Sequence, residues 1–413
     1  MPLVARFAPM DTQVRHTLTL LGAAYALAWA TTSMGAGPGS AAVVEISGKL
    51  SYAGLYVAIF NVGAAAGAAL GGRAMDRYGR KPPLVASYLL AAVGYLVAGI
   101  GVQTATLPTF IVGGLMLAAA FGTANLSRLA VAELFPPWER GRGVAWIQIA
   151  AIFGAVAGPV LLILSGPIGE LLGRDSLGLI WFFAPPLLLV AALLAARAKE
   201  PRSITGEFAT SPAAPASASV PVDPAHNARL ITAGTVSLAA SQTSMAAVMG
   251  IGGAAVAHAG HGVPVLGSVM LVHFIGMFGL SRVVGGIADR VGRVQTILIG
   301  LALLATGGAI IALVPGIVAF GTGLLLVGFG WSFGFIGSTV LLTDASAPDR
   351  RARTLGRADL TGQLSSAVIA TGGGWWFAAR GAAGLGILAI VVAMVPVGLL
   401  LRFGKAASEP ARA

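Results

Sequence analysis

The most informative stretch of the chain is Gly71-Gly72-Arg73-Ala74-Met75-Asp76-Arg77-Tyr78-Gly79-Arg80-Lys81, a charged turn between two long apolar segments. A shorter copy, Gly285-Gly286-Ile287-Ala288-Asp289-Arg290-Val291-Gly292-Arg293, stands in the second half of the chain. Glycine permits close helix approach and positive φ. Aspartate is favoured near a helix N-terminus by the helix dipole, and arginine offers forked hydrogen bonds to carboxylates. The two copies predict matching charged turns between pairs of helices.

Apolar segments long enough to cross a membrane make up most of the 413 residues. Hydrophobic residues account for 56% of the chain and charged residues for only 10%, with a mean hydropathy of +0.86. A soluble domain carries about a quarter charged residues, and a span needs about 20 apolar ones. Since backbone groups in lipid must be paired within the segment, we predict an all-α polytopic membrane protein with twelve transmembrane helices, at 17–37, 52–73, 83–103, 108–134, 143–165, 177–197, 230–257, 264–286, 294–314, 317–343, 355–378 and 382–402.

Lysine and arginine are distributed unevenly between the two sides of these spans. With the N-terminus inside, only Lys49, Arg174 and Arg380 lie outside and Arg128 lies within a span. This positive-inside pattern predicts a multi-pass protein of the plasma (inner) membrane with both termini cytoplasmic. The net charge of +11 therefore reflects topology, and we do not expect nucleic-acid binding. The first apolar segment resembles a secretory signal, but the later spans alternate correctly only if it is kept as an uncleaved helix.

The chain divides into two similar halves. A shift of 213 positions places Gly72 on Gly285, Asp76 on Asp289, Arg80 on Arg293 and Arg140 on Arg353. Such internal duplication is a signature of secondary transporters. The segment between the halves is rich in alanine, proline and serine, a composition typical of linkers. We predict an N-terminal six-helix bundle at 1–198, a cytoplasmic linker at 199–228 and a C-terminal six-helix bundle at 229–413.

These features resemble the major facilitator superfamily, whose loop G-x-x-x-D-R-x-G-R-[KR] is similar to the quoted turn. The resemblance covers the whole chain and implies two pseudo-symmetric six-helix bundles, working by alternating access and closest to the drug/metabolite:proton antiporter-like branch. It implies that the loops latch the halves together on the cytoplasmic side in the outward-facing state. Asp76 is expected near Arg353 and Arg357, and Arg80 is expected to pair with Glu133. The other residues of this gate are Gly72, Arg77, Gly79, Arg140, Asp289 and Arg293. The alternative is a turn that merely obeys the positive-inside rule.

Span five contains Gly154-Ala155-Val156-Ala157-Gly158-Pro159, which resembles the core of a motif of proton-linked drug antiporters in this superfamily. The further glycines of that motif are replaced by Val160-Leu161-Leu162. The alternative for Gly154, Gly158 and Pro159 is ordinary packing of small residues between membrane helices.

Three ionisable residues lie within spans, where a charge is costly and needs a reason. Arg128 either faces the central path or extends to the cytoplasmic surface. Asp359 either takes a proton or pairs with nearby arginines, and His273 either titrates or packs. We take these three as candidates for proton coupling. The candidates for the lining of the substrate cavity are the polar, aromatic and methionine residues Trp29, Thr32, Asn125, Gln242, Met245, Trp331 and Gln363.

The predicted function is secondary active transport, with proton-linked export (antiport, efflux) of a lipophilic or weakly polar small molecule. The alternative is an importer or facilitator of a small metabolite. An intramembrane enzyme would need clustered acids or histidines deep in the spans, and none is found, so we predict no enzyme. We expect no cofactor and no metal. The absence of cysteine removes thiolate metal sites and catalytic thiols, and the lack of a phosphate-binding loop argues against ATP use. The expected partners are the lipid bilayer, the solute and protons, and the expected state is a monomer.

Overall fold

The computed structural model describes residues 12–135, 140–200, 224–347 and 350–403, and within these ranges it contains helices and no strands. The helices of the first half are α1 (Thr12–Ala36), α2 (Pro38–Ser47), η1 (Leu50–Tyr52), α3 (Leu55–Tyr78), α4 (Lys81–Gln103), α5 (Leu107–Ala124), α6 (Ser127–Ala132), α7 (Arg140–Leu172), α8 (Ser176–Leu179), η2 (Ile180–Phe182) and α9 (Ala184–Arg197). Those of the second half are α11 (Pro224–His258), α12 (Val263–Phe278), α13 (Ser281–Val291), α14 (Arg293–Leu313), α15 (Ile317–Asp344), α16 (Arg351–Met394) and α17 (Val397–Phe403).

Helices cover the twelve predicted spans, so the all-α membrane fold class is confirmed. Among the described residues, nine stretches are long and apolar enough to cross a membrane. The last of them, Arg353–Arg402, contains two predicted spans, because the backbone turns sharply at Gly381, where φ is 61°. Predicted spans one and seven correspond to α1 and α11, which lie outside those nine stretches.

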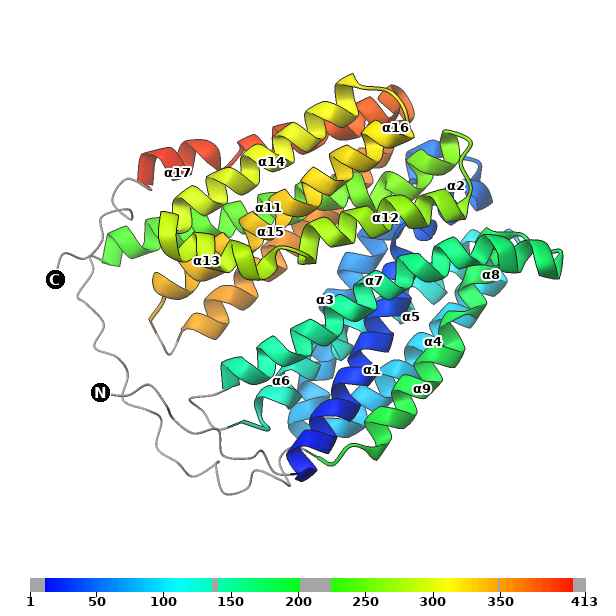
Figure 1. Cartoon of the computed structure of the whole chain (residues 1–413), viewed down its shortest axis with the longest axis horizontal. Helices are drawn as coiled ribbons and strands as arrows, with labels where there is room; N and C mark the ends of the chain where they lie inside the picture. Colours follow the sequence, from blue (N-terminus) through cyan, green and yellow to red (C-terminus); the bar gives the residue numbers. More distant parts are fainter. Residues whose placement is uncertain (1–11, 136–139, 201–223, 348–349, 404–413) are drawn as a thin grey trace.

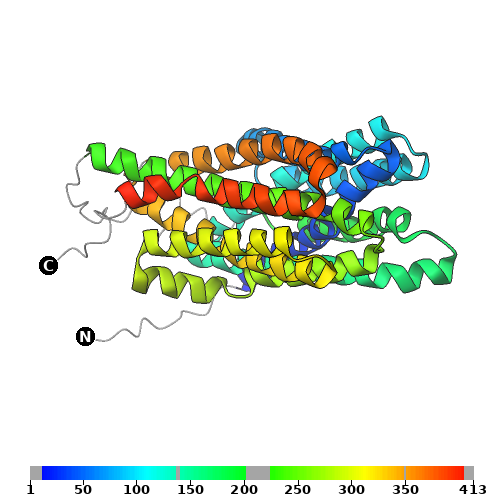
Figure 2. The same ribbon diagram turned by 90° about the horizontal axis from the view of Figure 1, so that it is seen from above.

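Each half of the chain forms its own helix bundle, and the long helices run along the length of the molecule (Figures 1 and 2). The first bundle packs around fully buried residues that include Leu84, Phe110 and Trp181. The second contains separate cores, one of them around Ile297, Leu304 and Val327. The predicted linker 199–228 lies mostly outside the described residues, so its boundaries and those of the two domains stay a prediction.

The halves touch closely at one end of the molecule, which we call the opposite end because it lies away from the charged turns. Here the Ala254 N–H of α11 donates a 3.1 Å hydrogen bond to Ser40 Oγ of α2. A side chain at Gly253 would collide with the carbonyl oxygen of Gly37, and one at Gly374 would collide with that of Ser51. Small residues therefore let the backbones of the two halves meet.

At the other end, which we call the arginine-rich end, the two bundles diverge. It holds the charged turns after α3 and α13. Figure 1 shows α6 and the start of α7 separating from α13 and the start of α16 toward this end. The two halves thus meet at the opposite end and spread apart at the arginine-rich end.

Candidate functional site

The first charged turn is held by an ion pair between Arg80 and Glu133. Arg80 Nε donates to both Glu133 carboxylate oxygens, at 3.0 and 3.1 Å, and Arg80 Nη1 lies 3.3 Å from Asp76 Oδ1. The Arg80 side chain is only 11% exposed. The hydrogen bonds that Arg80 donates to the Glu133 carboxylate raise the pKa of Arg80 above its ordinary value. Gly79, at φ 85°, makes the turn between α3 and α4. The expected contact between Arg80 and Glu133 is therefore present.

A further acid, which the sequence analysis missed, completes this turn. The Glu200 carboxylate accepts hydrogen bonds from the backbone N–H groups of Arg80 (2.8 Å) and Lys81 (3.0 Å). It thus caps the N-terminus of α4, where free N–H groups and the helix dipole favour a negative charge. Glu200 lies just beyond α9, and no local sequence pattern connects it with a turn that is 120 positions away along the chain.

The second charged turn repeats the ion pair. Arg293 Nε donates to Asp344 Oδ2 at 3.0 Å, and Arg293 Nη1 donates to the Ala288 carbonyl at 3.1 Å. Gly292, at φ 94°, takes the place of Gly79. The side chains of Asp289 and Arg140, both predicted gate residues, lie outside the described residues. Each half therefore pairs the last arginine of its charged turn with an acid from a later helix end.

The expected contact between Asp76 and the start of span eleven is absent among the described residues in this conformation, and it stays a prediction for the outward-facing state. Asp76 is 75% exposed and pairs only with Arg80 among the described residues. Arg353 and Arg357, at the start of α16, are exposed. The reason is the divergence of the two bundles at this end (Figure 1). Of the other predicted gate residues, Gly72 is half-buried beside Leu126, and Arg77 lies over the Tyr78 ring at 5.2 Å.

Charged and polar groups of both halves lie in one region deeper in the molecule. Asp359 of α16 accepts a 3.1 Å hydrogen bond from Gln242 Nε2 of α11. Arg128 of α6 is exposed and makes no hydrogen bond or ion pair within the described part of the chain. Its guanidinium is nonetheless close enough to act electrostatically on the Asp359 carboxylate and on Tyr25. The structure thus brings two of the three coupling candidates, one from each half, to the same region.

Aromatic rings connect the two halves beside this charged pair. The Trp29 ring of α1 packs edge-on against Phe121 at 5.3 Å and against Phe278 of α12 at 5.9 Å. Phe278 in turn contacts Trp331 of α15 at 5.9 Å. The Trp331 indole nitrogen is buried without a hydrogen-bond partner. The Trp29 indole nitrogen lies near the Tyr25 hydroxyl, but the two make no hydrogen bond of ordinary geometry. These two tryptophans are therefore the cavity candidates that the structure brings together.

Some of the remaining candidates have a packing role in the structure, and the others have no assigned role. Asn125 Oδ1 accepts a 2.7 Å hydrogen bond from the Tyr25 hydroxyl. Met245 and Gln363 are half-buried. His273 is fully buried, and its Nδ1 lies 2.7 Å from the Leu324 carbonyl oxygen, so it ties α12 to α15, while its Nε2 has no partner. This environment is that of a packed histidine within one half, away from the divergence of the bundles.

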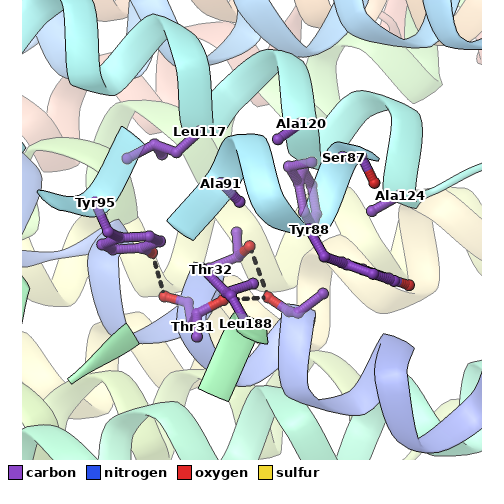
Figure 3. Close-up of a pocket in the computed structure, with 12 residues that line it drawn as sticks. Thr31, Thr32, Ser87, Tyr88, Ala91, Tyr95, Leu117, Ala120, Ala124 and Leu188 are labelled. Atoms are coloured by element: carbon purple, nitrogen blue, oxygen red, sulfur yellow. Dashed lines mark hydrogen bonds between the residues drawn. The ribbon is translucent and has the colours of Figure 1, made fainter. Parts of the chain in front are cut away.

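A cavity of about 10 Å³ lies within the first bundle, between α1, α4 and α5 (Figure 3). Thr32 and Tyr88 line it, and the Tyr95 hydroxyl donates to the Thr31 carbonyl beside it. The Thr32 hydroxyl donates to the Ala28 carbonyl at 2.9 Å. Such a volume holds about one water molecule. Thr32 therefore faces a packing defect of the first bundle and not a space of solute size.

The motif of span five packs against α1. A side chain at Gly154 would collide with the Ala26 carbonyl and one at Gly158 with Ser33, whose hydroxyl lies 3.3 Å from the Gly154 carbonyl oxygen. The Pro159 carbonyl lies at the seam with the second half, 2.9 Å from a Cβ built on Gly267. The geometry thus agrees with the packing alternative.

The sequence also matches a family model and known proteins. The family model described as Major Facilitator Superfamily matches residues 18–370. The chain is 28% identical over 375 residues to the uncharacterized MFS-type transporter YdeG of Bacillus subtilis (strain 168), covering 86% of this chain and 84% of that one. It is 27% identical over 364 residues to the riboflavin transporter RfnT of Brucella anthropi, covering 84% and 85%.

Solved structures share the fold at low sequence identity. The D-xylose-proton symporter aligns with a TM-score of 0.69 at 20% identity, over 92% of this chain and 96% of that one. The nucleoside transporter NupG aligns with a TM-score of 0.72 at 14% identity, over 94% and 99%. At these identities the likeness establishes the arrangement of the helices and says nothing of the solute.

Proposed function

Because the chain belongs to the major facilitator superfamily of membrane transporters, we propose that it exports a lipophilic or weakly polar small molecule in exchange for protons. It is a transporter and not an enzyme, and it carries its solute by moving the two halves relative to each other. With the orientation that the positive-inside pattern predicts, the arginine-rich end faces the cytoplasm. On this proposal the conformation is an inward-facing one, and the protein is a monomer of the inner membrane with both termini in the cytoplasm.

The observation that carries the proton-linked part is the position of Arg128 opposite Asp359. A carboxylate and an unpaired guanidinium lie on different halves, within electrostatic range of each other. When the arginine-rich end closes, the two groups approach, and an ionised Asp359 pairs with Arg128. A proton on Asp359 removes that attraction and leaves the carboxyl group with its hydrogen bond to Gln242. The protonation state of one carboxyl group thereby biases which end of the carrier is open.

The rings around Trp29 support the choice of solute. A planar solute stacks favourably on aromatic faces, and the buried Trp331 N–H offers a donor to an acceptor atom of the solute. Among the residues described above for this region, Arg128 and Asp359 are the ones that carry a charge. A weakly polar, aromatic solute fits this chemistry better than a sugar, which needs many amide partners.

Transport of riboflavin is the second candidate function, and one comparison favours it. A relative 27% identical over most of both chains is named a riboflavin transporter. The isoalloxazine ring of riboflavin is planar and bears carbonyl acceptors, so it also suits Trp29 and Trp331. This candidate keeps the alternative of a metabolite carrier, with either direction of movement.

The test uses purified protein in liposomes that contain a pH-sensitive dye. Addition of fluorescent lipophilic cations or of riboflavin, under an imposed proton gradient, is followed by solute fluorescence and by lumen pH. Proton flux that accompanies solute movement and disappears in Asp359→Asn supports proton-linked exchange. Solute movement that is equally fast in Asp359→Asn, and that moves no protons, contradicts the coupling. Thr361→Val is the control, because Thr361 is exposed on the same helix and its hydroxyl donates only to the Arg357 carbonyl of that helix among the described residues.

A further inference from the structure

A single charged residue stands in the long apolar stretch that forms the last two predicted spans. Arg380 is the only charged residue between Asp359 and Arg402. It comes directly before Gly381, where the backbone of α16 turns sharply at φ 61°. This turn lies at the opposite end of the molecule (Figure 1). Arg380 is thus a cation at the end from which the positive-inside pattern excludes most others.

Two exposed tryptophans lie next to this cation on α16. Trp375 is 67% exposed and Trp376 is 39% exposed. The Arg380 guanidinium lies over the Trp376 ring, 5.5 Å from the ring centroid. A Cβ at Gly384 would come within 2.9 Å of Trp376 Cδ1 and 2.8 Å of Arg380 Cβ. The lack of a side chain at Gly384, after the turn, therefore makes room for the ring and the guanidinium together.

The side-chain hydrogen-bonding groups of this cluster are all donors, and they have no partner in the part of the chain that the structure describes. There, Arg380 makes no ion pair or hydrogen bond, and neither indole nitrogen of Trp375 and Trp376 makes a hydrogen bond. Guanidinium and indole N–H groups donate hydrogen bonds and do not accept them. The cluster thus offers a positive charge and several donors to a group that carries acceptors and a negative charge.

The depth of the cluster in the membrane follows from its neighbours. Gly374, the residue before Trp375, packs on the Ser51 carbonyl of η1, in the turn between α2 and α3. Arg380 comes about 9 Å further along the helix, at about 1.5 Å per residue, just before the chain turns back. The two tryptophans therefore lie where α16 leaves the apolar core of the bilayer, which is the level of the lipid headgroups.

We propose that Arg380, Trp375 and Trp376 form a binding site for an anionic phospholipid headgroup, in the leaflet at the opposite end of the molecule. The phosphodiester accepts hydrogen bonds from the guanidinium, whose forked donors match phosphate oxygens, and from the indole N–H groups. The ring faces lie against the glycerol and the first methylene groups of the lipid. The headgroup thereby supplies the negative charge that no described residue brings to Arg380.

The other two basic residues predicted at this end lack such a setting. Lys49 lies over the Tyr52 ring at 5.3 Å, but that ring is half-buried and packs on the core of the first bundle. Arg174, between α7 and α8, is exposed and has no ring contact among the described residues. Arg174 carries the same charge as Arg380 at the same end of the molecule, so it provides the matched control.

The test measures lipid binding by the full chain, purified in a non-ionic detergent. Native mass spectrometry gives the affinity of the most tightly bound lipid for phosphatidylglycerol and for phosphatidylcholine, which share the phosphate and differ in net charge. We expect Arg380→Gln to bind phosphatidylglycerol about fivefold more weakly than the parent, because one basic residue near an anionic surface contributes about 1 kcal/mol. Binding of phosphatidylcholine should change much less, and Arg174→Gln should bind both lipids as the parent does.

Two further variants separate charge from geometry. Arg380→Lys keeps the charge and loses the forked donors, so we expect it to retain part of the preference for phosphatidylglycerol. Trp376→Leu removes the ring under the guanidinium, and we expect it to weaken phosphatidylglycerol binding about threefold. Because this ring is partly exposed, Trp376→Leu also decides the question if Arg380→Gln does not fold. Unfolding temperatures of all variants show that a loss of binding is not a loss of structure.

Three results overturn the site. The first is equal binding of phosphatidylglycerol by the parent, Arg380→Gln and Trp376→Leu. The second is an equal loss in Arg380→Gln and Arg174→Gln, which means that any positive charge at this end has the same effect. The third is binding of soluble glycerol phosphate as tightly as phosphatidylglycerol, which means that the cluster takes a free anion and not a lipid. The measurement needs no transported solute, so its outcome is independent of the proposed function.

Discussion

The carboxylate of Glu200 accepts a 2.8 Å hydrogen bond from the backbone N–H of Arg80, although 120 positions separate the two residues. The same carboxylate accepts a hydrogen bond from the N–H of Lys81, so a residue just beyond the end of α9 caps the start of α4. The end of the first bundle, where the linker begins, is thereby attached to the charged turn. Movement at that turn is mechanically connected to the segment that leads into the second half.

Replacement of Glu200 by alanine removes this cap. Loss of a capping side chain costs about 1 kcal/mol, so we expect Glu200→Ala to lower the thermal unfolding temperature of the purified protein by a few degrees. Lys199→Ala is the control, because among the described residues the Lys199 amine donates only to the exposed Gln13 side chain. Equal unfolding temperatures for the two variants would show that the cap contributes nothing.

The Arg80–Glu133 pair is predicted to act as a unit. Replacement of one partner removes the hydrogen bonds between the two from a half-buried charge of the other, at a cost of about 1–3 kcal/mol. We expect Arg80→Gln and Glu133→Gln to destabilise the protein individually and the double variant to be little worse than either. A double-mutant cycle on detergent unfolding measures the coupling. Strictly additive effects would contradict a direct pair.

The seam at the opposite end depends on the absence of a side chain at Gly374. We expect Gly374→Val to prevent full closure of the seam, because the added atoms collide with the Ser51 carbonyl. Transport should fall at least tenfold, and the outer ends should stay apart in spin-label distances. Gly372→Val, two positions away on α16, is the control, since a Cβ at Gly372 meets nothing within 4 Å. Similar transport by both variants would count against the seam as a gate.

Asp76→Asn tests the latch that the family resemblance implies. Asp76 is largely exposed here, so we expect the variant to fold with nearly the stability of the parent. Transport should nevertheless slow several-fold in reconstituted vesicles, because closure of the arginine-rich end requires Asp76 to meet the second half. Unchanged transport rates would remove Asp76 from the gate.

Arg128→Ala distinguishes the two interpretations of that arginine. If its guanidinium serves the space between the halves, transport is lost while expression and folding are kept, and Arg128→Lys retains part of the activity because the positive charge remains. Initial transport rates in vesicles provide the measurement. Normal rates in Arg128→Ala would mean that the side chain only reaches for the membrane surface.

Much of the architecture could be read from residue order. Runs of about 20 apolar residues must form helices in lipid. The positions of the arginines set the orientation of these helices, because burial of a charge in a bilayer is strongly unfavourable. The duplicated turns at Asp76 and Asp289 then predicted two similar halves. The Arg80–Glu133 contact followed from family resemblance and not from spacing, since helices must pack before residues 53 positions apart can meet.

Contacts between distant segments could not be predicted from the order of residues. Helices that face lipid on one side and protein on the other are apolar on both, so hydropathy does not reveal that Trp29 and Trp331 share Phe278 as a neighbour while His273 packs within one half. The contact of Glu200 with the first charged turn, and the cavity lined by Glu45 and His261, likewise bring together segments far apart in the chain. Local patterns made the helices predictable, whereas the three-dimensional packing of their faces placed each side chain at a gate, at a seam or in a core.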